Sequence, residues 1–251
     1  MLCKNRDVGR RLKPGWYVFV ALALYALVVT LAWRHDRAEL HRLRAALAGA
    51  PVASPRGDAS RYVLPLPGAC LPRKPEHLPG YPRPYRKGAN QGFIFENGDA
   101  CVPVVYGAGV VAAQRGRVLK AEQEYRELSA AEFDALVAAV AGGASPEQMD
   151  RLRGREVWIE HPDGRITVYA HLSGLRPDLS VGQLVERSEW IGYVGNSGTR
   201  AASRGSKKGA RLLLEVWQGN VDTGTYLGKG LDPRKNKDKL LTLARALFAV
   251  P

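Results

Sequence analysis

The chain has 251 residues, 45% of them apolar, which is enough for one sizeable core or for one domain with accessory segments. Its 37 lysines and arginines against 24 acidic residues give a formal net charge of +13. Such a surface attracts anions such as nucleic acid, lipid headgroups or a cell-wall polymer. The charge alone excludes neither these partners nor a basic surface without a partner.

An apolar run close to the N-terminus, residues 16–33, predicts a transmembrane helix. The run holds 18 residues without a charge and spans roughly 27 Å, just enough for a bilayer core. Trp16 and Trp33 stand at its ends, where an aromatic belt would lie. A cleaved signal peptide is the alternative, but the alanines that would imitate its cleavage site, at 46–50, lie well beyond the run.

The basic residues that flank this run predict its orientation. They are in greater excess before it, in the cytoplasmic segment 1–15, so the chain after residue 34 should lie outside the cytoplasm. We therefore expect a single-pass protein of the inner (cytoplasmic) membrane, with a cytoplasmic N-terminus and a domain in the periplasm or outside the cell. The membrane is then a partner, and nucleic acid is not expected as one.

The three cysteines divide between the two sides of this membrane. Cys3 falls on the cytoplasmic side and should be a free thiol. Cys70 and Cys101 fall outside, where oxidation is permitted. They can form one disulfide or remain two unpaired buried thiols.

Two segments connect the membrane run to the folded domain. Residues 34–50 predict a helical stalk, which is either plain or carries a short leucine seam for a homodimer. Residues 51–84 contain nine prolines, which break regular elements. They predict a semi-rigid linker or a strap lying across the domain.

The folded domain, residues 85–233, should be mostly β, with two antiparallel sheets. Residues 107–122 have short β-branched runs punctuated by glycine, as hairpins do. Two strands, 156–161 and 165–171, are joined by a Pro-Asp-Gly turn. Residues 211–217 predict another strand.

Helices are expected in two places. An insertion at 122–154 contains a capping box from Ser129 to Glu132 and a second helix start with Pro146 at its first position. The C-terminal segment, 234–251, should contain a short helix from residue 238.

Five segments of the domain carry a family resemblance. In chain order they are YRKGANQGFIF, GAGVVAAQRGRV, VYAHLSGL, VGQLVERSEWIGYVGNSGT and ARLLLEV. They resemble, in the same order, the motif blocks of the lysostaphin/LytM-type zinc metalloendopeptidases, peptidase family M23. The resemblance covers residues 85–233, with insertions at 96–106 and 122–154.

The resemblance implies a small two-sheet β fold with a groove in which peptide cross-links of peptidoglycan are hydrolysed. In the family, zinc is held by a histidine and an aspartate of the first block and by the second histidine of a His-x-His motif. Carried over position by position, these ligands fall on Asn90, Ile94 and Leu213. The first histidine of His-x-His falls on Arg211, and only His171 matches a catalytic histidine of the family.

The substituted positions make a family-type zinc site unexpected. Leu213 and Ile94 have no lone pair to donate, and Asn90 is a poor ligand. Strand alternation places Arg211, Leu213 and Glu215 on one face, so that a fixed cation and an aliphatic group stand where two imidazoles would project. Glu215 matches a family glutamate that is not a zinc ligand. We therefore expect no cofactor, in a groove lined by Asn90, Ile94, His171, Arg211 and Leu213.

Replacement ligands can be sought in the insertion at 96–106. Placing the first block on NGDAC would put Cys101 in the position of the aspartate, close to Asp99. This register loses the motif glycine, Gly92, and restores no histidine on the 211–217 strand.

Two histidines have plain interpretations. His171 could act as a lone general base near pH 7, but without zinc-bound water or a paired nucleophile it is better interpreted as a remnant. His161 follows a strand at a turn and is interpreted as a hydrogen-bonded turn residue.

A basic loop, residues 199–211, borders the groove in the family geometry. It can contact an anionic glycan-peptide or an acidic partner surface, or it can simply be solvated. A second basic segment, 229–239, is interpreted as plain surface. The loop cations beside Arg211 are Arg200, Arg204, Lys207 and Lys208.

These observations favour a membrane-anchored, catalytically inactive envelope protein that binds peptidoglycan or regulates its remodelling. Its partner is then peptidoglycan or a cell-wall hydrolase that it activates. One alternative is an active zinc metalloendopeptidase with a rearranged metal site. Another is a basic polyanion-binding module.

Overall fold

The computed structural model describes residues 61–249. The expected segments 1–15, 16–33 and 34–50, together with Cys3, lie outside the described residues. Within the described range, no helix is long and apolar enough to cross a bilayer.

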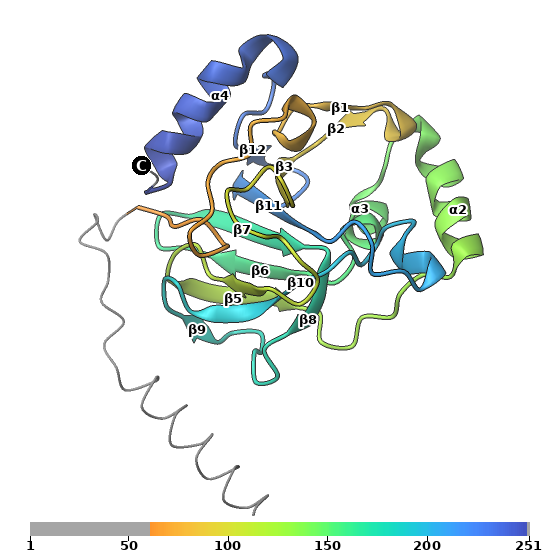
Figure 1. Ribbon diagram of the computed structural model, residues 1–251, viewed down its shortest axis with the longest axis horizontal. Coiled ribbons are helices and arrows are strands. Elements are labelled where there is room, and N and C mark those ends of the chain that lie inside the picture. The colour runs from red at the N-terminus through yellow and green to blue at the C-terminus, as the bar shows by residue number, and fades with distance from the viewer. Residues whose placement is uncertain (1–60, 250–251) are drawn as a thin grey trace, which may run out of the picture. The chain divides into compact units, whose positions relative to one another are not determined.

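Two antiparallel sheets form the body of the described domain (Figure 1). The large sheet has seven strands and the small sheet has three. The expected mostly β, antiparallel fold is therefore confirmed. The large sheet runs in the order β12 (Thr225–Tyr226), β11 (Arg211–Gln218), β7 (Arg165–Ala170), β6 (Val157–Glu160), β5 (Gly116–Ala121) and β9 (Leu184–Val185), with β3 (Gly92–Glu96) also paired to β11. The small sheet runs in the order β4 (Gly109–Val111), β10 (Trp190–Val194) and β8 (Leu172–Leu175).

Strand β11 is buried on both faces, and its sequence explains why. Leu212, Leu214 and Val216 point into the main core. Leu213 and Trp217 point to the opposite face and join a smaller apolar cluster there. A strand covered on both faces has a nearly continuous apolar run instead of a clean alternation.

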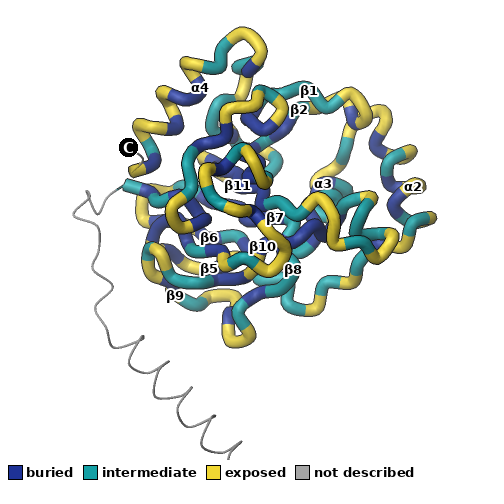
Figure 2. The backbone as a smooth tube through the Cα atoms, viewed as in Figure 1, coloured by how far each residue is buried: buried dark blue, intermediate teal, exposed yellow. Residues whose placement is uncertain are grey.

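The main core lies between the two sheets, and Figure 2 shows buried backbone running through both of them. Ile159 of the large sheet and Ile191 of the small sheet belong to this one cluster. The smaller cluster covers the other face of the large sheet and includes Ile94 beside Leu213. The site positions therefore lie on the outer face of the large sheet, away from the main core.

The expected helical insertion at 122–154 consists of α2 (Ala130–Ala139), the short η3 (Val140–Gly142) and α3 (Pro146–Arg153). Capping boxes begin both α-helices, and the sequence predicts the first of these boxes and the proline at the first position of α3. Helix α2 packs in a small apolar cluster of the insertion, whereas α3 delivers its last residue to the outer face of the large sheet.

Residues 61–84, which we call the strap, are the described part of the proline-rich segment 51–84. Their prolines prevent long regular elements but leave the side chains between them free to be buried. The strap therefore belongs to the folded unit, and the expected domain start at residue 85 falls inside that unit. The buried strap residues are Tyr62, Leu64, Leu66, Leu71 and Leu78.

A disulfide between Cys70 and Cys101 ties the strap to the loop after β3. The sequence left this pair open between a bond and two free thiols. The sulfurs are 2.07 Å apart, so the bonded alternative is the one present.

Short elements in the second half of the strap and just after it connect the strap to β3. The 3₁₀ turn η1 (Pro75–His77) is followed by a two-stranded hairpin of β1 (Pro82–Arg83) and β2 (Gly88–Ala89) around η2 (Pro84–Arg86). Another 3₁₀ turn, η4 (Ala202–Arg204), lies in the basic loop.

Helix α4 (Pro233–Leu247) follows the sheets in the chain and packs against the main core through Leu240 and Ala244. It begins five residues before the expected start at residue 238. Asp232 caps the helix through the backbone N–H of Arg234, and proline suits its first position, so the start lies earlier than the apolar pattern indicates.

Candidate binding groove

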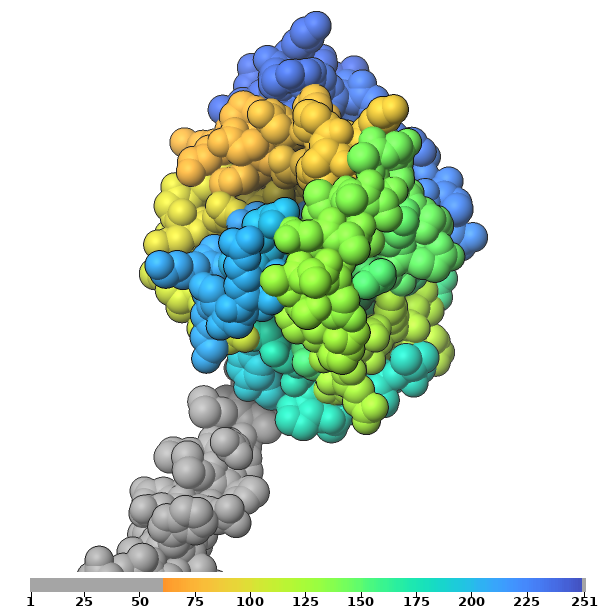
Figure 3. Space-filling view, turned by 90° about the vertical axis from the view of Figure 1, so that its right-hand side faces the viewer, coloured from red at the N-terminus to blue at the C-terminus, as the bar shows by residue number. Residues whose placement is uncertain are grey.

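A cavity of about 460 Å³ lies on the outer face of the large sheet. Its walls come from the β1–η2 hairpin, β3, the helical insertion, the start of the basic loop and β11. Figure 3 shows the hairpin in orange, the insertion in green and the basic loop in light blue meeting on one face of the molecule. All of the groove candidates line this cavity: Asn90, Ile94, His171, Arg211 and Leu213.

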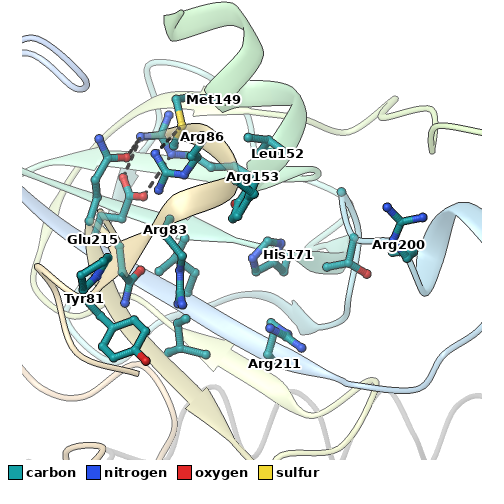
Figure 4. Close-up of a pocket in the computed structure, with 18 of the residues that line it drawn as sticks. Tyr81, Arg83, Arg86, Met149, Leu152, Arg153, His171, Arg200, Arg211 and Glu215 are labelled. Atoms are coloured by element: carbon teal, nitrogen blue, oxygen red, sulfur yellow. Dashed lines mark hydrogen bonds and ion pairs between the residues drawn. The ribbon is translucent and has the colours of Figure 1, made fainter. Parts of the chain in front are cut away.

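Strand register brings these positions together. Leu213 of β11 lies opposite Ile94 of β3 on one side and Ala170 of β7 on the other. His171 directly follows Ala170, at the point where the chain leaves the large sheet for the small one. Its φ of 64° is left-handed, so the corner itself turns the imidazole toward the cavity (Figure 4).

The three ligand positions of the family do not fit a zinc ion. Leu213 and Ile94 are apolar and buried, so they offer no donor atom. The Asn90 amide is 3% exposed and donates to the carbonyls of Leu78 at 2.9 Å and Gly92 at 2.7 Å. Among residues 61–249, no group of three His, Cys, Asp or Glu side chains is arranged to hold a metal.

The rearranged register on NGDAC does not supply substitutes. Cys101 is consumed in the disulfide. Asp99 accepts from the backbone N–H groups of Arg73 and Lys74 and lies 2.8 Å from Nδ1 of His77. Both candidate ligands therefore have structural roles away from the cavity.

His171 lies at the cavity as a neutral group. Its Nδ1 is 2.8 Å from the carbonyl oxygen of Ser197, which can only accept, so Nδ1 carries the proton and Nε2 keeps its lone pair. Burial, together with the charge of Arg211, lowers the pKa of His171 to about 4. Such a weak base is poorly matched to proton transfer at neutral pH.

Arg211 is held by an ion pair across the sheet. Its Nη2 lies 3.1 Å from Oε1 of Glu96, which is its register partner on β3. Glu96 also lies 3.5 Å from Nε2 of the buried His77. The line from Arg211 through Glu96 and His77 to Asp99 alternates in charge when the imidazole is protonated. No motif in the sequence indicates this line.

Glu215 forms a buried ion pair with Arg153 of the helical insertion. Arg153, the last residue of α3, is 1% exposed and places Nη2 2.9 Å from Oε2 of Glu215 (Figure 4). The same guanidinium pairs with Asp222 at 2.6 Å, and the indole N–H of Trp217 donates to Glu215 at 2.8 Å. The only indication of this ion pair in the sequence is a single glutamate in an apolar strand, because a buried carboxylate needs a partner.

Besides Arg211, one cation of the basic loop reaches the cavity. Arg200 lines it, stacks on Phe133 with 5.3 Å to the ring centroid and pairs with Asp134. Lys207 lies over Tyr106 in a neighbouring cavity. Arg204 and Lys208 are exposed and line no part of the groove.

His161 is a buried, hydrogen-bonded residue. Nδ1 lies 2.9 Å from the carbonyl of Arg115, and Nε2 lies 2.8 Å from Oγ1 of Thr167. Both ring nitrogens are used inside the fold, as its turn interpretation implies.

Two further arginines line the cavity that the sequence did not single out. Arg83 and Arg86 come from the β1–η2 hairpin and face the groove from the strap side (Figure 4). Arg86 stands inside the first motif block and Arg83 just before it, and this position is the one signal that could have indicated them.

The two-sheet antiparallel β domain carries its cavity on the outer face of the large sheet. Residues 127–227 match the model of peptidase family M23. The resemblance to lysostaphin/LytM-type peptidases is thereby confirmed.

Solved structures of similar proteins include peptidases. The catalytic domain of lysostaphin from Staphylococcus simulans is 18% identical, with a TM-score of 0.39, over 66% of this chain and 89% of that one. The catalytic domain of the prophage-encoded M23 protein EnpA from Enterococcus faecalis is 18% identical, with a TM-score of 0.39, over 65% and 92%. A zinc containing peptidase from Vibrio cholerae is 18% identical, with a TM-score of 0.37, over 62% of this chain and only 36% of its own. No curated protein matches the chain.

Proposed function

We propose that this protein is a non-catalytic, membrane-anchored member of the bacterial envelope that binds peptidoglycan through the groove. Residues 16–33 would be its anchor, and the domain would face the periplasm or the cell exterior. The observation that carries the proposal is the side-chain chemistry at the positions that match the family ligands. Leu213 and Ile94 are register partners without a donor atom, and the Asn90 amide donates to two backbone carbonyls.

The other polar groups of the groove support binding over hydrolysis. Hydrolysis of a peptide bond needs an activated water or nucleophile and a group that stabilises the developing charge. His171 is a weak base with its Nδ1 proton committed, and Glu215 is committed to Arg153. The arginines remain as groups that can contact a ligand without reacting with it.

The cavity itself supports a ligand of modest size. Its volume of about 460 Å³ falls within the range of small-ligand sites, and its walls combine aromatic rings with cations. Peptide and glycan chains that carry carboxylates match that lining. A cell-wall hydrolase that the domain activates is the second partner compatible with such a groove.

Co-sedimentation with isolated peptidoglycan sacculi tests the proposal. We expect the full-length chain to sediment with sacculi in the presence of zinc and to release no new peptide ends. Release of peptide ends that scales with protein concentration would overturn the non-catalytic part. Failure to sediment with sacculi at any concentration would overturn the binding part.

A variant of an exposed cation serves as the control. Arg204→Gln removes one charge from the basic loop without touching the groove. If this change alone abolished sedimentation, the interaction would be general attraction to a polyanion, as in the alternative of a basic polyanion-binding module.

A further inference from the structure

The arginines of the cavity fall into two groups. Three of them have carboxylate partners: Arg153 pairs with Glu215, Arg200 with Asp134, and Arg211 with Glu96. Arg83 and Arg86 have none within residues 61–249. The positive charge that the described protein does not compensate at the groove is therefore concentrated on the β1–η2 hairpin.

Arg86 is the more deeply buried of the two. It is 9% exposed, its Nη2 donates to the carbonyl of Ala89 at 2.6 Å, and its Nη1 lies 3.1 Å from the Met149 sulfur. A thioether is a weak acceptor, and Nε has no acceptor in the described structure. A buried guanidinium in this state is costly unless an anion reaches it.

Arg83 is half-buried and lies nearer the centre of the cavity (Figure 4). One nitrogen donates to the carbonyl of Glu76 at 2.9 Å, and the guanidinium lies 5.4 Å from the Tyr81 ring centroid. Burial lowers its pKa, and the charges of Arg86 and Arg211 lower it further. The guanidinium groups of Arg83, Arg86 and Arg211 are therefore close enough to influence one another. Of the three, only Arg211 is paired with Glu96.

The wall beside Arg86 indicates how a ligand would lie. A second cavity of about 290 Å³ is adjacent, and Arg86, Gln91 and Met149 line both cavities. The contact of Arg86 with Met149 therefore stands between the two cavities. The buried guanidinium of Arg86, which has no carboxylate partner among the described residues, therefore lies at the wall that the two cavities share.

We propose that the groove binds the free carboxylate end of a short peptide, with Arg83 and Arg86 receiving the terminal carboxylate. Planar guanidinium groups match a carboxylate in geometry and charge. Tyr81, Phe133 and Leu152 line the remaining walls and suit the apolar parts of the peptide. This assignment rests on the proposed function. It adds which part of the peptide is recognised, namely a chain end and not an interior peptide bond.

Calorimetric titration of the full-length chain with two matched peptides tests the proposal. The probes are N-acetyl-trialanine as the free acid and the same peptide as its C-terminal amide, which differ in one negative charge. We expect the acid to bind more tightly by roughly tenfold to a hundredfold, as for the loss of a charge-assisted hydrogen bond. Equal affinities, or no binding of the acid, would overturn the proposal.

Substitution of the half-buried arginine assigns the contact. Arg83→Gln should weaken binding of the acid by at least about tenfold and leave the amide unchanged. Arg204→Gln removes the same charge from an exposed site outside the cavity and should leave both affinities unchanged. Thermal denaturation of each variant checks that it is folded. Arg86 is not the first target, because substitution of a buried arginine can unfold the domain. An equal loss in both variants would contradict the assignment.

The two proposals fail in different ways. If the chain sediments with sacculi but does not distinguish acid from amide, the proposed function stands and the carboxylate site is overturned. If Arg83-dependent binding of the acid is found without sedimentation on sacculi, the carboxylate site stands and peptidoglycan is not its source.

Discussion

The two ends of the cavity differ in how their polar groups are satisfied. At one end, Leu213 is apolar, the Asn90 amide donates to two backbone carbonyls, and Arg211 is paired with Glu96. At the hairpin end, Arg83 and Arg86 have no carboxylate partner within the described residues. The polar groups at the first end are paired within the described protein, whereas the two guanidinium groups at the second end have no carboxylate there.

The largest expected effect comes from Arg153, the buried cation that pairs with Glu215 and Asp222. Arg153→Leu would leave the carboxylates of Glu215 and Asp222 buried without a cation. Removing one partner of a buried ion pair typically costs about 3–5 kcal/mol of unfolding free energy. Urea denaturation monitored by tryptophan fluorescence measures this loss.

The matched control for this change is Arg126→Leu. The ion pair of Arg126 with Glu132 is exposed, so its loss should leave the denaturation midpoint almost unchanged. Equal midpoints for the two variants would show that Glu215 does not depend on Arg153, and that it is free to act in the groove.

A somewhat smaller effect is expected from His171 and depends on pH. Its folded pKa is about 4, below the ordinary value of 6.5, so the unfolded chain binds a proton that the folded chain does not. Stability should therefore fall by about 3 kcal/mol as the pH drops from 6.5 through 4. In His171→Gln this decrease should be absent, which comparison of unfolding free energies from pH 4 to pH 7.5 would detect. A pH dependence identical to that of the unsubstituted chain would contradict the buried, neutral imidazole.

The smallest effect, with the opposite sign, is expected from His77. Hydrogen bonding to Glu96 and Asp99 raises its pKa above 6.5 in spite of burial. Its stabilising contribution is therefore fully present below pH 6.5 and is lost as the pH rises through the folded pKa. The stability difference between the unsubstituted chain and His77→Gln should shrink above pH 6.5. A difference that grows with pH would show that the line from Arg211 to Asp99 does not hold a proton.

The register of the groove could be predicted from the sequence because the motif blocks keep their order and spacing. Ile94 and Leu213 were expected at corresponding positions, and they meet as register partners. The mostly β fold followed from the same blocks and from hairpin signals such as the turn between β6 and β7.

The partners of buried charges could not be predicted. Arg153 and Glu215 are 62 residues apart and meet only through the packing of α3 on the sheet. Arg83 and Arg86 are unremarkable in the sequence, since their lack of a carboxylate shows only when every neighbour is known. The strap was ambiguous for a similar reason: prolines indicate irregular backbone but not whether Tyr62 or Leu78 is buried.

Zinc binding by equilibrium dialysis tests the central claim most directly, namely that this groove is a metallopeptidase site whose ligands have been replaced. The full-length chain is compared with a quadruple variant carrying Asn90→His, Ile94→Asp, Arg211→His and Leu213→His. We expect no specific zinc on the unsubstituted chain and about one zinc ion per chain on the folded variant, because tetrahedral histidine and carboxylate sets bind this ion. About one zinc ion on the unsubstituted chain, or none on the folded variant, would contradict the account.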